Sequence, residues 1–248
     1  RVDRYLAAAR LPEIPGEVIA VMAPHAGHFY SGPVAGYAFA AVKGMKPELV
    51  AVVSPMHYPY PYPLLTSLHR AYATPLGEIP VDTLAVEALD RLLQERLGES
   101  LTGVAQDPEH SLEIELPFLQ RALPQPFTLL PVMVHEQSEA TVRALGEALA
   151  QVLLDRNALL VASTDLSHFY SQETAHTFDG EMLRRVESFD PQAVLQAEEQ
   201  GKGFACGRGA LAAVMWAAKA LGADRALILK HATSGDISGD YSQVVGYG

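Results

Sequence analysis

The sequence predicts a single α/β domain, with a mostly parallel or mixed central sheet and helices on both faces. Two observations lead to this fold class. Short runs rich in Val, Ile and Leu, the length of buried strands, alternate along the chain with segments whose apolar residues recur at helical spacing. Strands that alternate with helices form a largely parallel, covered sheet. Without an internal repeat or a low-complexity linker, we expect one domain over residues 1–248.

The apolar runs are the expected strands. Most of them lack the alternation of a half-buried strand, which is typical of strands covered on both faces. In chain order, the expected strands are residues 18–23, 49–53, 127–134, 158–162, 226–229 and 243–247. The Pro-rich stretch at residues 54–63, "SPMHYPYPYP", predicts a stiff surface loop within the domain.

Helical spacing marks the segments between these runs. One helix is expected to begin at Asp190-Pro191, because proline is favoured in the first turn. Lys219 interrupts the apolar segment 209–223, which is also shorter than the roughly 20 residues of a bilayer span, so we expect a buried helix there. The other expected helices are residues 85–97, 113–123, 142–152 and 179–189.

Composition limits the function classes. The chain is 49% hydrophobic and 19% charged, which suits a large core. A net charge of −11 without a basic run argues against nucleic acid and against anionic membranes as partners. The single cysteine cannot form an intrachain disulfide, so we expect a cytoplasmic location, although a start at Arg1 leaves a removed leader open.

Chemistry-bearing side chains follow five of the expected strands. Parallel strands end at one edge of the sheet, so we expect these side chains to converge there. The alternative is that each is an ordinary loop residue; His135 fits both interpretations equally, and His69 fits a structural role. In strand order, the residues are His25, His57, His135, the pair Asp165 and His168, and His231.

Two further features each keep two interpretations. Cys206 precedes the expected helix at 209–223, where a helix N-terminus favours a thiolate, but a cysteine among small residues is also a common inert core residue. His110 and Glu113 share one face of the expected helix at i, i+3, or they belong to a charged helix start.

Other motifs are absent. No P-loop and no G-x-S-x-G nucleophile elbow occurs. The stretch "GKGFACG" lacks the spacing of a dinucleotide fingerprint and follows a helical segment instead of a strand. "HEQSE" lacks the second histidine of a zincin.

Six motifs in order resemble the Memo family, whose prokaryotic branch is called AmmeMemoRadiSam system protein B. They are "APHAGHFYSG", "VVSPMHY", "EHSLEIELPFL", "STDLSHFY", "ACGRGAL" and "TSGDISGDYSQVVGYG". The resemblance implies a fold similar to class III extradiol dioxygenases, which cleave catechol rings with iron(II) held by two histidines and a glutamate. The branch name implies a shared pathway with a radical-SAM enzyme and an AMMECR1-domain protein.

By this resemblance, the metal ligands are His25, His57 and Cys206, with the cysteine at the position of the dioxygenase glutamate. Asp165 and His168 match an S-D-x-x-H pair that lines the pocket. The resemblance also matches His110 and Glu113 to E-H-S-x-E, while His28 stands where many family members have tyrosine.

We therefore expect one transition metal ion, Fe(II) or Cu before Zn, and redox or oxygen-related chemistry on an unknown substrate. His168, oriented by Asp165, is expected to act as acid or base, with His110 as a further catalytic group and with His28 and Glu113 lining the pocket. One alternative is a non-catalytic protein that binds a small molecule or peptide, with Tyr58–Tyr62 as contact surface. The other is a true extradiol dioxygenase.

Overall fold

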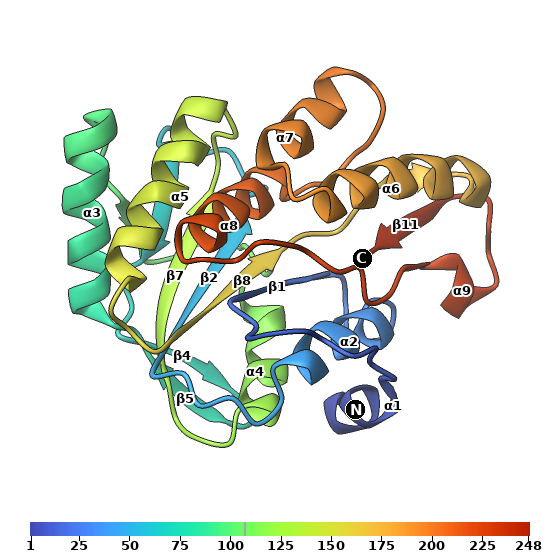
Figure 1. Ribbon diagram of the computed structural model, residues 1–248, viewed down its shortest axis with the longest axis horizontal. Coiled ribbons are helices and arrows are strands. Elements are labelled where there is room, and N and C mark those ends of the chain that lie inside the picture. Colours follow the sequence, from blue (N-terminus) through green and yellow to red (C-terminus); the bar gives the residue numbers. More distant parts are fainter. Residues whose placement is uncertain (107) are drawn as a thin grey trace.

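A six-stranded mixed sheet forms the centre of the molecule in the computed structural model, which describes residues 1–106 and 108–248 (Figure 1). Its strand order is β1-β8-β2-β7-β3-β6. The first four are parallel, β3 runs antiparallel to β7, and β6 is parallel to β3. The bounds are β1 Ala20–Ala23, β8 Ala158–Ser163, β2 Leu49–Pro55, β7 Thr128–Val134, β3 Leu64–Ser67 and β6 Thr102–Val104. This confirms the predicted fold class.

The register brings the carboxyl ends of the parallel strands to one level. Ala162 of β8 pairs with Met22 of β1 and with Val53 of β2, and Val53 also pairs with Val132 of β7. Segments that follow these strands therefore emerge together at one edge of the sheet, where sites form in open α/β sheets.

Helices cover both faces of the sheet, as Figure 1 shows. The alternation along β2 explains this: Leu49, Ala51 and Val53 belong to one buried cluster, whereas Val50 and Val52 belong to another. The first cluster includes side chains of α3 Thr83–Leu97, α5 Glu139–Leu153, α6 Gln172–Glu187, α7 Pro191–Glu199 and α8 Arg208–Ala220. The second includes side chains of α1 Val2–Ala8, α2 Gly32–Ala41 and α4 Leu116–Ala122.

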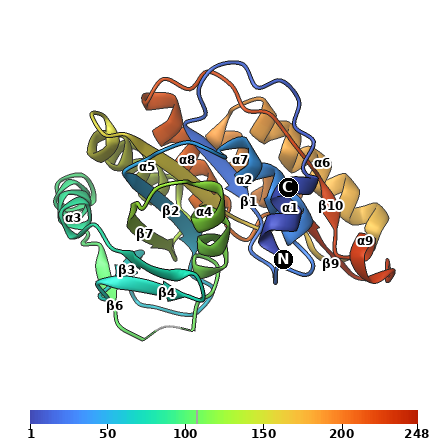
Figure 2. The ribbon, with the colours of Figure 1, turned by 90° about the horizontal axis from the view of Figure 1, so that it is seen from below.

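Smaller elements lie at the two ends of the main sheet (Figure 2). At the β3–β6 end lies the hairpin of β4 Ala71–Thr74 and β5 Gly77–Pro80. At the other end, the antiparallel strands β10 Ala232–Thr233, β11 Val244–Tyr247 and β9 His168–Tyr170 form a three-stranded sheet beside α9 Gly235–Ser238. The expected strand at 243–247 is thus real, but it belongs to this second sheet.

Several helix boundaries follow local signals. The side chains of Asp82, Ser138 and Asp190 accept backbone hydrogen bonds at the starts of α3, α5 and α7. The expected helix at 113–123 is divided into a 3₁₀ turn, η1 Glu113–Glu115, and α4, with Pro117 in the first turn of α4. The expected helix at 179–189 is the second half of α6.

The expected strand at 226–229 is wrong. Those residues form no ladder, and β1, which they pass, is an edge strand paired with β8. Ala226 and Ile228 pack on the core, while Leu227 is 42% exposed. The apolar run therefore reflects a loop that packs on the core through part of its side chains, and periodicity alone cannot separate these cases.

Within the described residues, no helix has the combination of length and apolar character that crossing a bilayer requires. The expected buried helix at 209–223 corresponds to α8, most of whose side chains are buried. Gly146 lets α8 approach α5 closely, because a Cβ there would lie 2.7 Å from the carbonyl oxygen of Ala213.

Candidate metal centre

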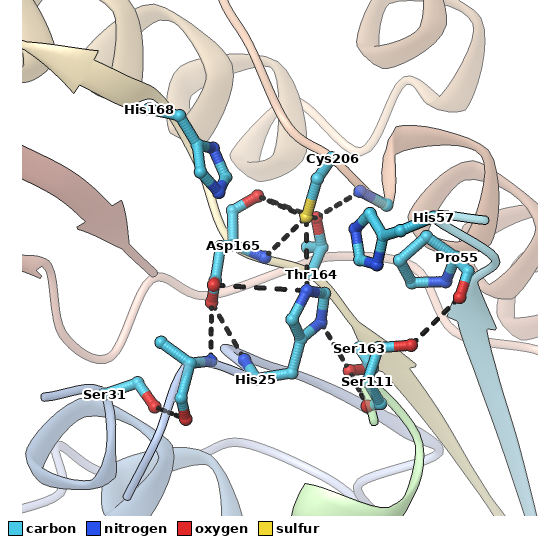
Figure 3. Close-up of polar contacts among 12 residues, drawn as sticks. His25, Ser31, Pro55, His57, Ser111, Ser163, Thr164, Asp165, His168 and Cys206 are labelled. Atoms are coloured by element: carbon cyan, nitrogen blue, oxygen red, sulfur yellow. Dashed lines mark hydrogen bonds and ion pairs between the residues drawn. The ribbon is translucent and has the colours of Figure 1, made fainter. Parts of the chain in front are cut away.

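Two imidazoles and one thiol meet at the carboxyl edge of the sheet. One nitrogen of His25, one nitrogen of His57 and the Sγ atom of Cys206 all lie within 4.8 Å of one another. His25 Nε2 is 3.3 Å from Cys206 Sγ, and the two imidazole centroids are 5.4 Å apart. Figure 3 shows the three side chains pointing toward one another.

The three residues come from distant segments. His25 follows β1, His57 follows β2, and Cys206 precedes α8. The backbone N–H of Cys206 donates to the carbonyl oxygen of Asp165, at 3.2 Å. Gly207 makes this approach of α8 to β8 possible, because a Cβ there would lie 2.5 Å from the carbonyl oxygen of Ser163.

His57 is oriented by Glu109, whose side chain is 1% exposed. His57 Nδ1 lies 3.0 Å from Oε2 of that carboxylate, which also accepts the backbone N–H groups of His57, His110 and Ser111 at 2.7–2.9 Å. Burial acts to raise the pKa of Glu109, but these hydrogen bonds outweigh it and hold the pKa far below its usual range. The carboxylate in turn raises the pKa of His57. With Nδ1 bound to a carboxylate, Nε2 of His57 is the nitrogen free for a metal.

His25 is 3% exposed and neutral. Burial, followed by the nearby His57 and His110, lowers the pKa of His25 to about 3. Its Nδ1 lies 2.8 Å from Ser163 Oγ, so its Nε2 faces Cys206. A neutral imidazole with one free nitrogen is the form that binds metals.

Cys206 and Asp165 carry protons more readily than usual. Burial, reinforced by Asp165, raises the pKa of the Cys206 thiol to about 12, so the helix start does not by itself produce a thiolate. Burial raises the pKa of Asp165 to about 7, although its Oδ1 accepts the backbone N–H groups of His25 at 2.8 Å and Ala26 at 3.3 Å. A bound metal ion deprotonates a coordinating thiol, so a thiol in the metal-free protein is compatible with a ligand role.

His168 and His110 lie beside the cluster. The ring of His168 lies 5.8 Å from that of Phe204, two residues before Cys206, and burial lowers the pKa of His168. Its Nδ1 is 2.8 Å from the carbonyl oxygen of Leu166, so that carbonyl orients the ring, in place of the expected Asp165. The ring of His110 is 6.2 Å from that of His25, with its side chain 53% exposed.

The other expected site residues have separate surroundings. His28 Nε2 lies 2.8 Å from the carbonyl oxygen of Ile114, and its ring meets Phe118 edge-on. Glu113 is exposed on η1. His135 accepts the backbone N–H of Tyr60 at 3.4 Å, and His231, which follows no strand, lies 2.8 Å from the buried carboxylate of Asp179.

Sequence reasoning did not assign a role to Glu109, Glu115 or Ser163. Ser163 Oγ lies 2.6 Å from the carbonyl oxygen of Ser111 and 3.0 Å from Oε1 of Glu115. Burial raises the pKa of Glu115, which is fully buried, well above its usual range. A serine that ends a buried strand and two acids in the motif "EHSLEIEL" were the available signals.

The fold and the cluster define an α/β protein with a partly buried histidine–histidine–cysteine set at the carboxyl edge of its sheet. A model of the Memo-like protein family matches residues 2–248. The chain therefore belongs to the Memo family.

Relatives with the same family name support this assignment. The MEMO1 family protein of Methanopyrus kandleri is 38% identical over 243 residues, which are 96% of this chain and 85% of that protein. The corresponding protein of Nitrosopumilus maritimus is 35% identical over 93% of this chain and 83% of its own length. The MEMO1 family protein of Thermotoga maritima is 34% identical over 99% of this chain and 88% of its own length.

An apolar cavity of about 210 Å³ lies away from this cluster. It is bounded by edge strand β1, by α2 and by residues 223–230. None of the three cluster residues lines it. The geometry of the donor atoms, and not cavity size, therefore marks the candidate site.

Proposed function

We propose that this protein binds one transition metal ion through His25 Nε2, His57 Nε2 and Cys206 Sγ, and that the site performs redox or oxygen-related chemistry on a small molecule. The observation that carries the proposal is the closeness of three suitable donor atoms from three distant segments, all within 4.8 Å of one another.

The donor set fits such an ion. Bonds of about 2.0–2.1 Å to nitrogen and 2.3 Å to sulfur place a nitrogen and a sulfur donor of a tetrahedral site roughly 3.5–3.6 Å apart. The observed separation of His25 Nε2 and Cys206 Sγ is 3.3 Å, so a small adjustment of the two side chains would admit an ion. Two imidazoles and a thiolate favour Fe(II), Cu or Zn over Mg or Ca, and three protein ligands leave positions open for a substrate.

The surrounding residues supply proton transfer. The ion, when bound, supplies Lewis-acid or redox chemistry. Asp165 is held through Oδ1 by two backbone N–H groups, while Oδ2 lies 4.0 Å from His25 Nε2. With a pKa of about 7, Asp165 exchanges its proton near neutral pH beside the proposed ligands His25 and Cys206. His168 is the second acid–base candidate, and its Nε2 is the available nitrogen because Nδ1 bonds to Leu166.

The closeness of the donor atoms also bears on the alternative of a pocket that binds a peptide or small molecule without a metal. That alternative predicts three side chains too far apart to share an ion. The 3.3 Å contact between His25 and Cys206 favours the metal site. A ring-cleaving dioxygenase is disfavoured because, by the family resemblance, Cys206 stands where those enzymes have a metal-binding glutamate.

The test is metal content in protein purified without chelator. We expect close to one ion per chain in the wild type and in His135→Ala, a matched control that removes a strand-end histidine outside the cluster. His25→Ala, His57→Ala and Cys206→Ser should each lose most of the metal. Cobalt(II) loading should give a sulfur-to-metal charge-transfer band that disappears in Cys206→Ser. Unchanged stoichiometry in all three cluster variants would exclude the proposed site.

A further inference from the structure

A buried hydrogen-bond chain lies behind His25 and is not part of the proposed ligand set. Ser163 Oγ is at its centre, 2.8 Å from His25 Nδ1, 2.6 Å from the carbonyl oxygen of Ser111 and 3.0 Å from Oε1 of Glu115. The side chains of Ser163 and Glu115 are both completely buried. Figure 3 shows Ser163 and Ser111 below and to the right of the imidazole of His25, on the side of the ring away from Cys206.

Proton counting assigns the direction of each hydrogen bond. A serine hydroxyl has one proton to donate and two lone pairs to accept with. The carbonyl oxygen of Ser111 can only accept, and its contact is the shortest of the three, so it takes the hydroxyl proton. Both remaining neighbours of Ser163 must then donate. His25 therefore carries its proton on Nδ1, and Glu115 carries one on Oε1.

The surroundings of Glu115 support a neutral acid. Its Oε2 has no hydrogen-bond partner in the part of the chain that the structure describes. A buried carboxylate with an unpaired oxygen is far more costly than a buried neutral acid. If Glu115 were ionised, its Oε1 would face a lone pair of Ser163 Oγ with no proton between the two oxygens, because the hydroxyl proton of Ser163 already bonds to the carbonyl oxygen of Ser111.

Two neighbouring contacts hold this chain in place. His28 Nε2 lies at hydrogen-bond distance from the carbonyl oxygen of Ile114, the residue before Glu115. Ser111 Oγ donates to the carbonyl oxygen of Pro55, at the end of β2. Ser111, whose carbonyl oxygen accepts from Ser163, is thus tied to the end of β2, and the segment before Glu115 is tied to the loop that follows β1.

We propose that Ser163 is a positioning residue, which, together with the neutral acid of Glu115, fixes His25 as the Nδ1–H tautomer and so directs the free Nε2 lone pair at the metal position. The inference rests on the proposed metal site for its purpose. The tautomer itself is a property of the metal-free protein, so it is tested separately.

The first measurement uses wild-type protein without metal. Long-range ¹H–¹⁵N spectra of the imidazoles should show His25 protonated on Nδ1. Infrared spectra at neutral pH should contain the C=O band of a protonated carboxyl group that is absent from Glu115→Gln. An Nε2–H tautomer of His25, or the lack of a band that depends on Glu115, would overturn the proposal.

The second measurement compares variants, with Zn(II) as the probe. In Ser163→Ala, we expect a shift of His25 toward the Nε2–H tautomer and Zn(II) binding weakened about 10–100-fold. Ser54→Ala is the matched control, since Ser54 is equally buried near the end of β2 and its Oγ has no partner among the described residues. It should leave both readouts unchanged. Glu115→Gln keeps a neutral donor and should stay within about threefold of wild type.

The outcomes separate this inference from the metal proposal. Wild-type protein that binds no Zn(II) but shows the Nδ1–H tautomer supports the positioning role and contradicts the metal site. If Ser163→Ala changes neither the Zn(II) affinity nor the tautomer of His25, the positioning role is contradicted and the metal site is not. If Ser163→Ala does not fold, the wild-type tautomer and the Glu115 band still decide.

Discussion

Substitution of Glu109 by glutamine tests whether the buried carboxylate prepares His57 for a metal. Among the residues that the structure describes, the carboxylate accepts hydrogen bonds from the His57 ring and from three backbone N–H groups. Glutamine keeps one acceptor oxygen but turns the other into an NH₂ donor. The N–H groups that bond to the replaced oxygen would therefore face the NH₂ group of the glutamine, and these donors would be buried without an acceptor.

The size of the effect follows from these contacts. Hydrogen bonds to a charged group contribute about 1.5–3 kcal/mol each, and a buried donor left unpaired costs about 1–3 kcal/mol. We therefore expect Glu109→Gln to lower the free energy of unfolding by about 3 kcal/mol. Loss of a carboxylate that orients a ligating histidine weakens metal binding about 10–100-fold, which is about 1.4–2.8 kcal/mol of binding free energy.

Two measurements check this prediction. Urea unfolding of metal-free protein gives the change in stability, and chelator competition gives the Zn(II) dissociation constant. Glu113→Gln is the matched control because it makes the same substitution, with the same change in net charge, at an exposed position of the same segment. Equal Zn(II) affinity for Glu109→Gln and Glu113→Gln would refute the reasoning.

Three other substitutions test packing and charge elsewhere. Gly207→Ala places a Cβ 2.5 Å from the backbone oxygen of Ser163, so we expect a loss of about 1–3 kcal/mol of unfolding free energy, measured in urea, and weaker Zn(II) binding because Cys206 must move. Gly180→Ala lies in α6 with open space around the new methyl group, and we expect a gain of about 0.5–1 kcal/mol by the same assay; a loss there would contradict the packing of α6. Hydrogen bonds from Arg184 and Arg185 lower the pKa of Glu181 to about 2, so its contribution to stability is present above pH 4.5 and is lost as the pH falls toward 2. Glu181→Gln should therefore have a lower melting temperature than wild type at pH 7, and its melting temperature should fall less between pH 4.5 and pH 2. Equal falls in melting temperature for both proteins over this range would count against the ion pair.

Local sequence patterns predicted the parts of this protein that local physics controls. Buried parallel strands need continuous apolar runs, and such runs marked β1, β2, β7 and β8. Ser138 and Asp190 begin helices through their own side chains. The placement of His25 and His57 after parallel strands predicted that they meet, because the register of such strands brings their ends to one edge.

Pairing between distant residues was beyond those patterns. The run at 226–229 reads as a strand, yet a strand needs a partner, and the edge of β1 does not pair with it. Glu109 and Glu113 are the same residue type in the same short segment, and the sequence does not separate their roles. In the structure, Glu109 is buried against His57, whereas Glu113 is exposed.

The sequence by itself therefore determined the α/β fold class, the strand-end positions of His25 and His57, and the family motifs that include Cys206. Only the tertiary structure decided that Glu109 holds His57, that Leu166 orients His168, and that Ser163 joins Glu115 to His25. The physical reason is that burial and hydrogen-bond partners are properties of a position in three dimensions. The partners of Ser163, for example, lie 48 to 138 positions away along the chain and become its neighbours only after the sheet has formed.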